Sequence, residues 1–185
     1  MASPSRLYLI RHGRPSAGFA DAVDPGLDDV GHTQAQAVAQ ELAFLGPLPV
    51  ITSPLKRARE TAVPFEAQWN VTARVESRVA EIPSPSENLE DRATWLYRAL
   101  RGRWSDLSPA HQTWREQLVR CLVTQEASTV ITTHFVAINA AVGVATSDDR
   151  LVCFEPDHCS CTVLEVVNGS LQVISLGHQR ATQIR

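Results

Sequence analysis

The sequence is poor in lysine and lacks long apolar runs. Lys56 is the only lysine among 17 basic residues, and the formal net charge is −3, which argues against general affinity for nucleic acids. Because the apolar runs are too short to cross a bilayer and residues 1–6 do not form a signal peptide, we expect a cytoplasmic protein without a membrane partner. The four cysteines are therefore expected to be reduced thiols.

No internal repeat or low-complexity segment divides the 185 residues, so we expect one domain over residues 1–185. Strand-like and helix-like segments alternate along most of the chain. This order predicts a three-layer α/β/α domain with a mostly parallel central sheet and antiparallel pairing at one edge. Strands are expected at residues 6–11, 50–52, 71–75, 129–133, 150–154, 161–167 and 171–176, the last two as a hairpin around Gly169.

Helices are expected between these strands, where apolar residues recur at helical spacing. One helix should begin after Gly31 and end at Gly46-Pro47, and a second should begin with Ser53 as its N-cap and Pro54 in its first turn. The prolines of residues 82–88 exclude regular structure there. Further helices are expected at residues 89–100, 107–122 and 135–142.

Two histidines follow two of the buried strands. The triplet Arg11-His12-Gly13 ends the first strand, and His134 follows the 129–133 strand. Since ligands of open α/β sheets bind beyond the carboxyl ends of the strands, both histidines are expected in one crevice. The arginine of the triplet makes this crevice attractive to an anion such as phosphate, and its glycine would let the backbone come close to that ligand.

His12 has the chemistry of a nucleophile, because a neutral imidazole is available near neutral pH and Arg11 can supply the positive charge that attack on a phosphoryl group requires. Arg57 lies one turn into the second helix, where its guanidinium can reach over a helix N-terminus that itself favours anions. Each signal also has an ordinary explanation. A short Arg-His-Gly triplet matches by chance in many proteins, and Arg57 could belong to a solvated helix face.

Together these segments resemble the histidine phosphatase superfamily, also called the phosphoglycerate mutase-like family. The resembling segments follow one another in the family's order within residues 6–142, and they are residues 11–13, 27–35, 53–58 and 133–134. The resemblance implies a phosphoglycerate mutase-like fold in which His12 is phosphorylated transiently. It also implies that Arg11, Arg57 and His134 surround the transferred phosphoryl group.

The family also uses an acidic residue after the third strand to protonate the leaving oxygen. Glu81 occupies that place in this sequence. Partial burial beside an anionic substrate would raise its pKa, as this function requires. Glu76, Glu87 and Glu90 compete for the same role, although surface ion pairing would also explain them.

The resemblance implies a metal-independent phosphatase that hydrolyses a phosphomonoester of a small molecule and needs no cofactor. His12 would displace the leaving group while Glu81 protonates it, and the same carboxylate would then activate the water that hydrolyses the phosphohistidine. The chain has no room for the extra segment of the glycolytic mutases, which favours a phosphatase over a phosphoglycerate mutase-type phosphotransferase. The sequence is also compatible with a protein phosphohistidine phosphatase or with a non-catalytic phosphate-binding module.

The chain departs from the family's pattern around the expected phosphate site. Arg14, Pro15 and Gly18 stand where the family commonly has phosphate-binding residues, which leaves Arg14 or Ser16 to supply the missing contacts. Phe135 replaces the glycine that commonly follows the second histidine, and we expect it to narrow the pocket. These differences affect the substrate contacts more than the catalytic residues.

Two further segments have weaker functional interpretations. Residues 82–125 could form a helical lid that selects the substrate, although their arginines and aromatic residues are also typical of an amphipathic helix with a solvated face or of a nucleic-acid surface. Cys153, His158, Cys159 and Cys161 fit no common zinc pattern. Ordinary packing or surface thiols are therefore expected there, and no metal site.

Overall fold

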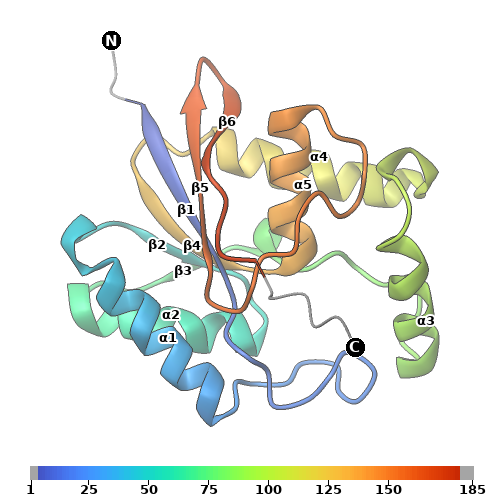
Figure 1. The fold of residues 1–185 in the computed structure, drawn as a ribbon, viewed down its shortest axis with the longest axis horizontal. Coiled ribbons are helices and arrows are strands. Elements are labelled where there is room, and N and C mark those ends of the chain that lie inside the picture. The colour runs from blue at the N-terminus through green and yellow to red at the C-terminus, as the bar shows by residue number, and fades with distance from the viewer. Residues whose placement is uncertain (1–3, 180–185) are drawn as a thin grey trace.

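The computed structural model describes residues 4–179 and contains a six-stranded sheet with the order β3-β2-β4-β1-β5-β6 (Figure 1). The strands are β1 (Ser5–Arg11), β2 (Val50–Thr52), β3 (Arg74–Val75), β4 (Thr129–Thr133), β5 (Cys161–Val167) and β6 (Ser170–Ser175). The first four pair in parallel, whereas β5 pairs with β1 and β6 pairs with β5 in antiparallel fashion. The predicted α/β fold, with a mostly parallel sheet and one antiparallel edge, is confirmed.

Helices connect the strands and cover the sheet. The α-helices of the described residues are α1 (Asp29–Glu41), α2 (Lys56–Trp69), α3 (Leu89–Ala99), α4 (Pro109–Val123) and α5 (Phe135–Thr146). Asp28 caps α1, because its carboxylate accepts a hydrogen bond from the backbone N–H of Gly31 at 2.7 Å. α1 therefore begins before Gly31 rather than after it.

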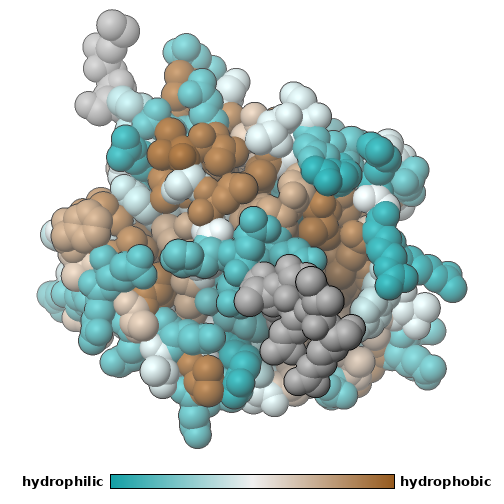
Figure 2. Space-filling view, viewed as in Figure 1, coloured by the Kyte–Doolittle hydropathy of each residue, from teal (hydrophilic) through white to brown (hydrophobic). Residues whose placement is uncertain are grey.

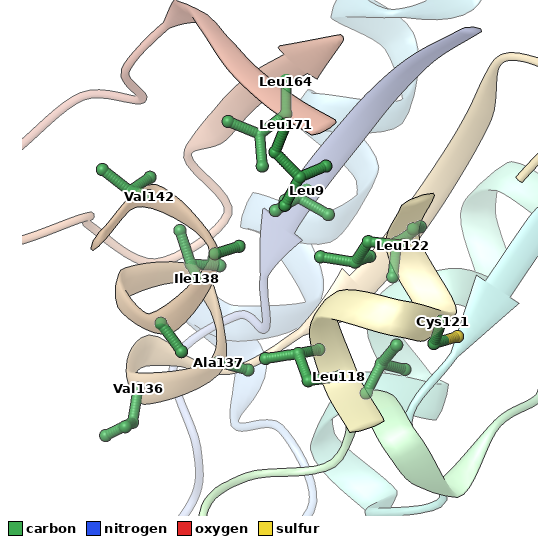
Figure 3. Packing of buried hydrophobic residues seen from close by; sticks show 14 of the residues in the cluster. Leu9, Leu118, Cys121, Leu122, Val136, Ala137, Ile138, Val142, Leu164 and Leu171 are labelled. Carbon is green, nitrogen blue, oxygen red and sulfur yellow. The ribbon is translucent and has the colours of Figure 1, made fainter. Parts of the chain in front are cut away.

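Side chains of β1 alternate between two apolar cores, one on each face of the sheet. Leu7 and Leu9 belong to the core that contains side chains of α4 and α5, whereas Tyr8 and Ile10 belong to the core that contains side chains of α1 and α2. Figure 3 shows Leu9 between side chains of α5 and α4. Each fully buried leucine or isoleucine contributes about 1.5–3 kcal/mol to stability. These two cores separate the sheet from a helical layer on each side.

Apolar surface remains around the hairpin of β5 and β6. Ile174 and Leu176 are exposed, and Figure 2 shows hydrophobic side chains gathered over the part of this face where β5 and β6 lie in Figure 1. Neither residue lines the cavity beside His12. This surface is therefore separate from the candidate site.

The second helix begins later than the sequence indicates. α2 starts at Lys56, and Leu55 rather than Ser53 is its N-cap. The Ser53 hydroxyl instead accepts a hydrogen bond from the backbone N–H of Leu55 at 3.2 Å and lies 2.7 Å from Nε2 of His134. The chain after β2 thus forms a turn in which Ser53 contacts His134, and α2 begins after this turn.

Two expected strands are shortened or absent. Only β3 remains of the strand expected at residues 71–75, and no strand forms at residues 150–154. The backbone N–H groups of Cys153 and Phe154 donate to the side-chain oxygen of Asn139 at 2.7 and 3.1 Å. An asparagine of α5 thus satisfies donors that a neighbouring strand would otherwise satisfy.

Residues 82–125, for which a helical lid was one of the interpretations, contribute both to the candidate site and to the core. Leu96 of α3 and Leu100, which follows this helix, line a cavity beyond the carboxyl ends of the parallel strands. Leu118 and Leu122 of α4 are buried in the core shown in Figure 3. α4 is therefore part of a helical layer of the fold. That the C-terminal end of α3 with Leu100, called the α3 end below, acts as a lid stays a prediction.

Candidate active site

The two histidines lie at the carboxyl ends of β1 and β4, which are neighbours in the sheet. The backbone N–H of His12 donates to the carbonyl of Thr133 at 2.9 Å. The ring centres of His12 and His134 are 5.2 Å apart. Parallel pairing thus brings together two side chains that are far apart in the sequence.

Hydrogen bonds fix the tautomer of His12. Its Nδ1 lies 2.8 Å from the carbonyl oxygen of Gly13, which can only accept, so Nδ1 carries the proton. Nε2 lies 3.2 Å from Nε of Arg57, which can only donate, so Nε2 presents its lone pair. The imidazole is almost fully buried. The neutral ring therefore has one defined nucleophilic nitrogen.

Burial and positive charge keep His12 neutral. Burial lowers the pKa of His12 well below 6.5, and the guanidinium groups of Arg57 and Arg11 lower it further. Arg57 comes from the first turn of α2 and is itself buried. Its side chain also lies 3.9 Å from the carboxylate of Asp24. A buried arginine that touches the lone pair of His12 can hold an anionic oxygen beside the same nitrogen.

His134 presents a buried nitrogen for which the structure shows no protein partner. The residue is the N-cap of α5, and its Nε2 lies 2.7 Å from the Ser53 hydroxyl. Within residues 4–179, no group forms a hydrogen bond with Nδ1 of His134. Burial lowers the pKa of this imidazole well below 6.5, and His12 and Arg57 add to the effect. A buried polar atom without a partner is costly, so this nitrogen is suited to a bound ligand.

Arg11 places a second guanidinium near the histidines. Its Nη1 donates to the carbonyl of Pro156 at 2.9 Å, and its guanidinium carbon lies 5.2 Å from the centre of the Phe135 ring. The positive charge of Arg11 lowers the pKa values of His12 and His134. Phe135 is thus one wall of the site and supports the arginine by a cation–π contact.

Glu81 lies at the N-terminus of α5, in the cavity that contains His12. Its carboxylate accepts hydrogen bonds from the backbone N–H of Val136 at 3.2 and 3.3 Å and from that of Ile82 at 3.0 Å. Burial raises the pKa of Glu81 above 4.5, although these hydrogen bonds and the charge of Arg57 oppose the shift. Glu81 can therefore hold a proton at a pH where an exposed carboxyl would not.

The competing carboxylates lie elsewhere. Glu76 pairs with Arg78 through two hydrogen bonds at 2.9 and 2.7 Å, and it also accepts one from Arg74. Glu87 and Glu90 are exposed. None of these three glutamates lines the cavity beside His12. Of the four candidates from the sequence, only Glu81 shares a cavity with a histidine.

Most of the candidate residues line a cavity of about 780 Å³, whereas His134, which is fully buried, is not among the lining residues. Arg11, His12, Arg57 and Glu81 form its polar end, and the residues that follow β1 together with the α3 end form much of the rest. The three residues expected to contact substrate, Arg14, Ser16 and Phe135, also line it. Arg14 is already bonded to Asp28, with its Nε 2.5 Å from Oδ2.

His158 lines this cavity, and the sequence interpretation did not place it there. Its ring centre lies 5.8 Å from that of His12. The available signal was antiparallel pairing: β5 begins beside the end of β1, and the backbone N–H of Cys159 donates to the carbonyl of Arg11 at 2.9 Å. Residues just before β5 must therefore reach the edge of the sheet that carries His12. Within residues 4–179, no group of three or more histidine, cysteine or acidic side chains is arranged to hold a metal ion.

Gly13 has a packing role in addition to the expected approach to a ligand, which stays a prediction. A Cβ atom at Gly13 would lie 2.6 Å from the carbonyl oxygen of Gly31, so the close contact is with α1. The backbone N–H of Gly13 donates to the Thr61 hydroxyl at 3.0 Å, and that hydroxyl donates to the carbonyl of Arg57 at 2.7 Å. Gly13 thus packs the loop after His12 against α1 and links it to the helix that carries Arg57.

A sequence profile described as the histidine phosphatase superfamily (branch 1) matches residues 7–179. The chain belongs to this superfamily. The match reaches all six strands of the sheet and confirms the resemblance that rested on four short segments. Among the described residues, no helix is long and apolar enough to cross a membrane.

Curated relatives of this histidine phosphatase superfamily member match it over part of their length. Glucosyl-3-phosphoglycerate phosphatase from Mycobacterium tuberculosis (strain ATCC 25618 / H37Rv) is 34% identical over 80 residues, which are 41% of this chain and 36% of that protein. An uncharacterized protein from the same strain is 30% identical over 124 residues, which are 64% of this chain and 61% of that protein. The match thus spans less than two thirds of either relative.

Solved structures of similar fold cover nearly the whole chain. Mycobacterial glucosyl-3-phosphoglycerate phosphatase in complex with VO3 has a TM-score of 0.71 at 20% identity, covering 92% of this chain and 98% of that chain. Phosphoserine phosphatase from Entamoeba histolytica in complex with 3-phosphoglyceric acid has a TM-score of 0.72 at 20% identity, covering 95% and 98%. These similarities support the fold assignment.

Proposed function

We propose that this protein is a phosphomonoesterase that transfers a phosphoryl group to Nε2 of His12 and then to water. One observation carries the proposal: the bonds to Gly13 and Arg57 leave Nε2 unprotonated in a cavity that also contains Glu81. A neutral imidazole with a fixed lone pair is the form required for nucleophilic attack on phosphorus.

The positive charge that attack requires comes from side chains around this nitrogen. The guanidinium groups of Arg57 and Arg11 offset the charge of the phosphoryl oxygens, which is greatest when the P–N bond forms. If the Ser53 hydroxyl donates to Nε2 of His134, Nδ1 of His134 carries the proton and donates to a third position on the phosphoryl group. Three donors from three segments thus surround the group that is transferred.

Glu81 serves both steps. In the first step, its carboxyl proton passes to the leaving oxygen as the P–O bond breaks and the N–P bond to His12 forms. In the second step, the Glu81 carboxylate takes a proton from water while the water oxygen attacks phosphorus and the N–P bond breaks. Inorganic phosphate leaves, and His12 and Glu81 return to their starting protonation states.

The relatives support hydrolysis of a small phosphorylated molecule. The names of the matched proteins describe phosphatases for glucosyl-3-phosphoglycerate and for phosphoserine. These proteins and this chain have the same α/β scaffold. Substrate specificity depends on the residues that line the outer cavity, which is the part of the cavity outside its polar end. The polar end of the cavity therefore supports the reaction, and the outer cavity determines which leaving group is accepted.

Trapping the phosphorylated enzyme tests the proposal. The protein is mixed with p-nitrophenyl phosphate and a chelator and then quenched in alkali, because phosphohistidine is stable to base and labile to acid. Tandem mass spectrometry should locate one phosphoryl group on His12. The His12→Ala variant should show neither phosphorylation nor turnover, whereas the control variant His32→Ala, at an exposed histidine, should show both. Binding of phosphate or vanadate without turnover by the native protein would instead identify a non-catalytic module.

A further inference from the structure

Beyond its polar end, the cavity is mostly apolar. The polar end contains Arg11, His12, Arg57 and Glu81, and half of all the lining residues are apolar. The largest apolar side chains of the lining are those of Phe19, Leu96, Leu100 and Phe135. They come from the loop after β1, from the α3 end and from the start of α5. An apolar surface of this kind stabilises an apolar ligand by removing both from water.

Arg14 and His158, which line the cavity outside its polar end, each lie beside a carboxylate. Arg14 is paired with Asp28 at 2.5 Å, and Nδ1 of His158 lies 3.9 Å from the carboxylate of Asp157. Two further acidic residues, Asp21 and Glu155, line the cavity and are exposed. Arg92, which does not line the cavity, has its guanidinium against the Phe19 ring. A second anionic group on a ligand would therefore meet the carboxylates and the apolar surface of the lining, and its desolvation would be poorly compensated.

A cation–π contact holds the apolar wall in place. The guanidinium carbon of Arg92, in α3, lies 4.7 Å from the centre of the Phe19 ring. This contact joins the loop after β1 to the helix that contributes Leu96. The contact favours one arrangement of these two segments before a ligand enters, which reduces the entropy that binding must overcome.

We infer that the substrate is a phosphomonoester of an apolar alcohol or phenol that carries no second anionic group. The inference rests on the proposed function in one respect, since the phosphoryl group occupies the polar end beside His12. Phe19, Leu96 and Leu100 contact the apolar part of the leaving group and determine specificity. A phosphorylated hydroxy acid, with its carboxylate, is excluded by the charges of the outer cavity.

Binding of phosphonates tests this inference without any catalytic step. Methyl-, propyl- and hexylphosphonate are titrated into the native protein by calorimetry. The dissociation constant should fall about threefold to fourfold for each added methylene until the cavity is filled. In an isosteric pair, 3-methylbutylphosphonate should bind about tenfold more tightly than 3-phosphonopropionate. Affinity that is independent of chain length, or tighter binding of the carboxylate, would overturn the inference.

Variants of two phenylalanines show which surface recognises the chain. Phe19→Ala should weaken binding of hexylphosphonate about fivefold and leave binding of methylphosphonate unchanged, because only the longer chain reaches Phe19. Phe44→Ala, at an exposed phenylalanine that does not line the cavity, should change neither. Equal effects of Phe19→Ala on both ligands would remove Phe19 from the specificity surface.

The outcomes distinguish the inference from the proposed function. If the phosphonates follow the expected order but no phosphohistidine forms, the catalytic proposal fails and the ligand class stands. If phosphohistidine forms on His12 while the carboxylate-bearing phosphonate binds more tightly, the catalytic proposal stands and the ligand class is wrong.

Discussion

Nε of Arg57 lies 3.2 Å from Nε2 of His12. The cation that would bind the phosphoryl group therefore touches the nitrogen that would attack it. Protonation of Nε2 would place two N–H donors against each other, so this contact favours the neutral imidazole. One arginine thus both keeps the nucleophile unprotonated and supplies positive charge beside it.

Replacement of Arg57 should affect both functions. Arg57→Ala should lower kcat by about 10²–10³-fold, which is the usual cost of removing one group that stabilises developing negative charge. The same variant should raise the pKa of His12, because a positive charge that lowers it is gone. The acid limb of the profile of kcat/KM against pH should then move to higher pH. Arg59→Ala, at an exposed arginine of the same helix, is the control and should change neither quantity.

The native enzyme should be most active in mildly acidic solution. Activity requires a neutral His12, whose pKa lies well below 6.5, and a protonated Glu81, whose pKa lies above 4.5. As the pH falls through the pKa of His12, the imidazole gains a proton and activity is lost. As the pH rises through the pKa of Glu81, the acid loses the proton that the leaving group needs. Rates measured from about pH 3 to 9 should give a bell-shaped curve, and an acid limb centred above 6.5 would contradict the assignment.

The Glu81→Gln variant should change the alkaline limb of the pH–rate profile and leave the acid limb in place. The amide cannot donate an acidic proton, so hydrolysis of alkyl phosphates, whose leaving groups are strongly basic, should fall by about 10²–10⁴-fold. p-Nitrophenyl phosphate should lose much less, because p-nitrophenolate leaves without a proton. The alkaline limb should also disappear. Equal losses on both classes of substrate would show that Glu81 is not the acid.

The arrangement of the candidate site follows largely from local sequence patterns. His12 and His134 each follow a strand that is mostly or entirely buried, and parallel strands end at the same edge of a sheet. Arg57 falls in the first turn of α2, from which its side chain reaches that edge. These positions depend on strand ends and helix spacing, which a sequence shows directly.

The rest depends on contacts between distant segments. The local pattern favours Ser53 as a helix cap, because nothing nearby in the sequence indicates its bond to His134, 81 residues away. His158 reaches the cavity only because β5 returns antiparallel beside β1. The strand expected at residues 150–154 is replaced by bonds to the side chain of Asn139. In each case a tertiary partner overrides the local preference.

Ser53→Ala should weaken catalysis while leaving the fold intact. Without the hydroxyl, Nε2 of His134 loses its 2.7 Å contact and the tautomer of the ring is no longer fixed. We expect about a tenfold loss in kcat, since a hydrogen bond of this kind contributes about 1 kcal/mol or slightly more. Ser170→Ala, at an exposed serine of β6, should be silent. Unchanged kcat in Ser53→Ala would show that the serine does not orient His134.

Glu76 should stabilise the fold in a way that depends on pH. Hydrogen bonds from Arg78 lower the pKa of Glu76 to about 2. Because the folded-state pKa lies below the value of about 4.3 in an unfolded chain, the ionised carboxylate stabilises the native state above that pH. The stabilisation is lost as the pH falls from there toward 2.

The variant Glu76→Gln should therefore lower the free energy of unfolding by about 1–2 kcal/mol at about pH 7, after allowance for the solvent around the exposed partner arginines. Urea denaturation at a series of pH values should show that this difference becomes smaller below about pH 4. At that pH the unsubstituted Glu76 begins to bind a proton in the unfolded state. Glu90→Gln, at an exposed glutamate of α3, provides the matched control. A difference that stays constant with pH would mean that Glu76 acts through packing and not through its charge.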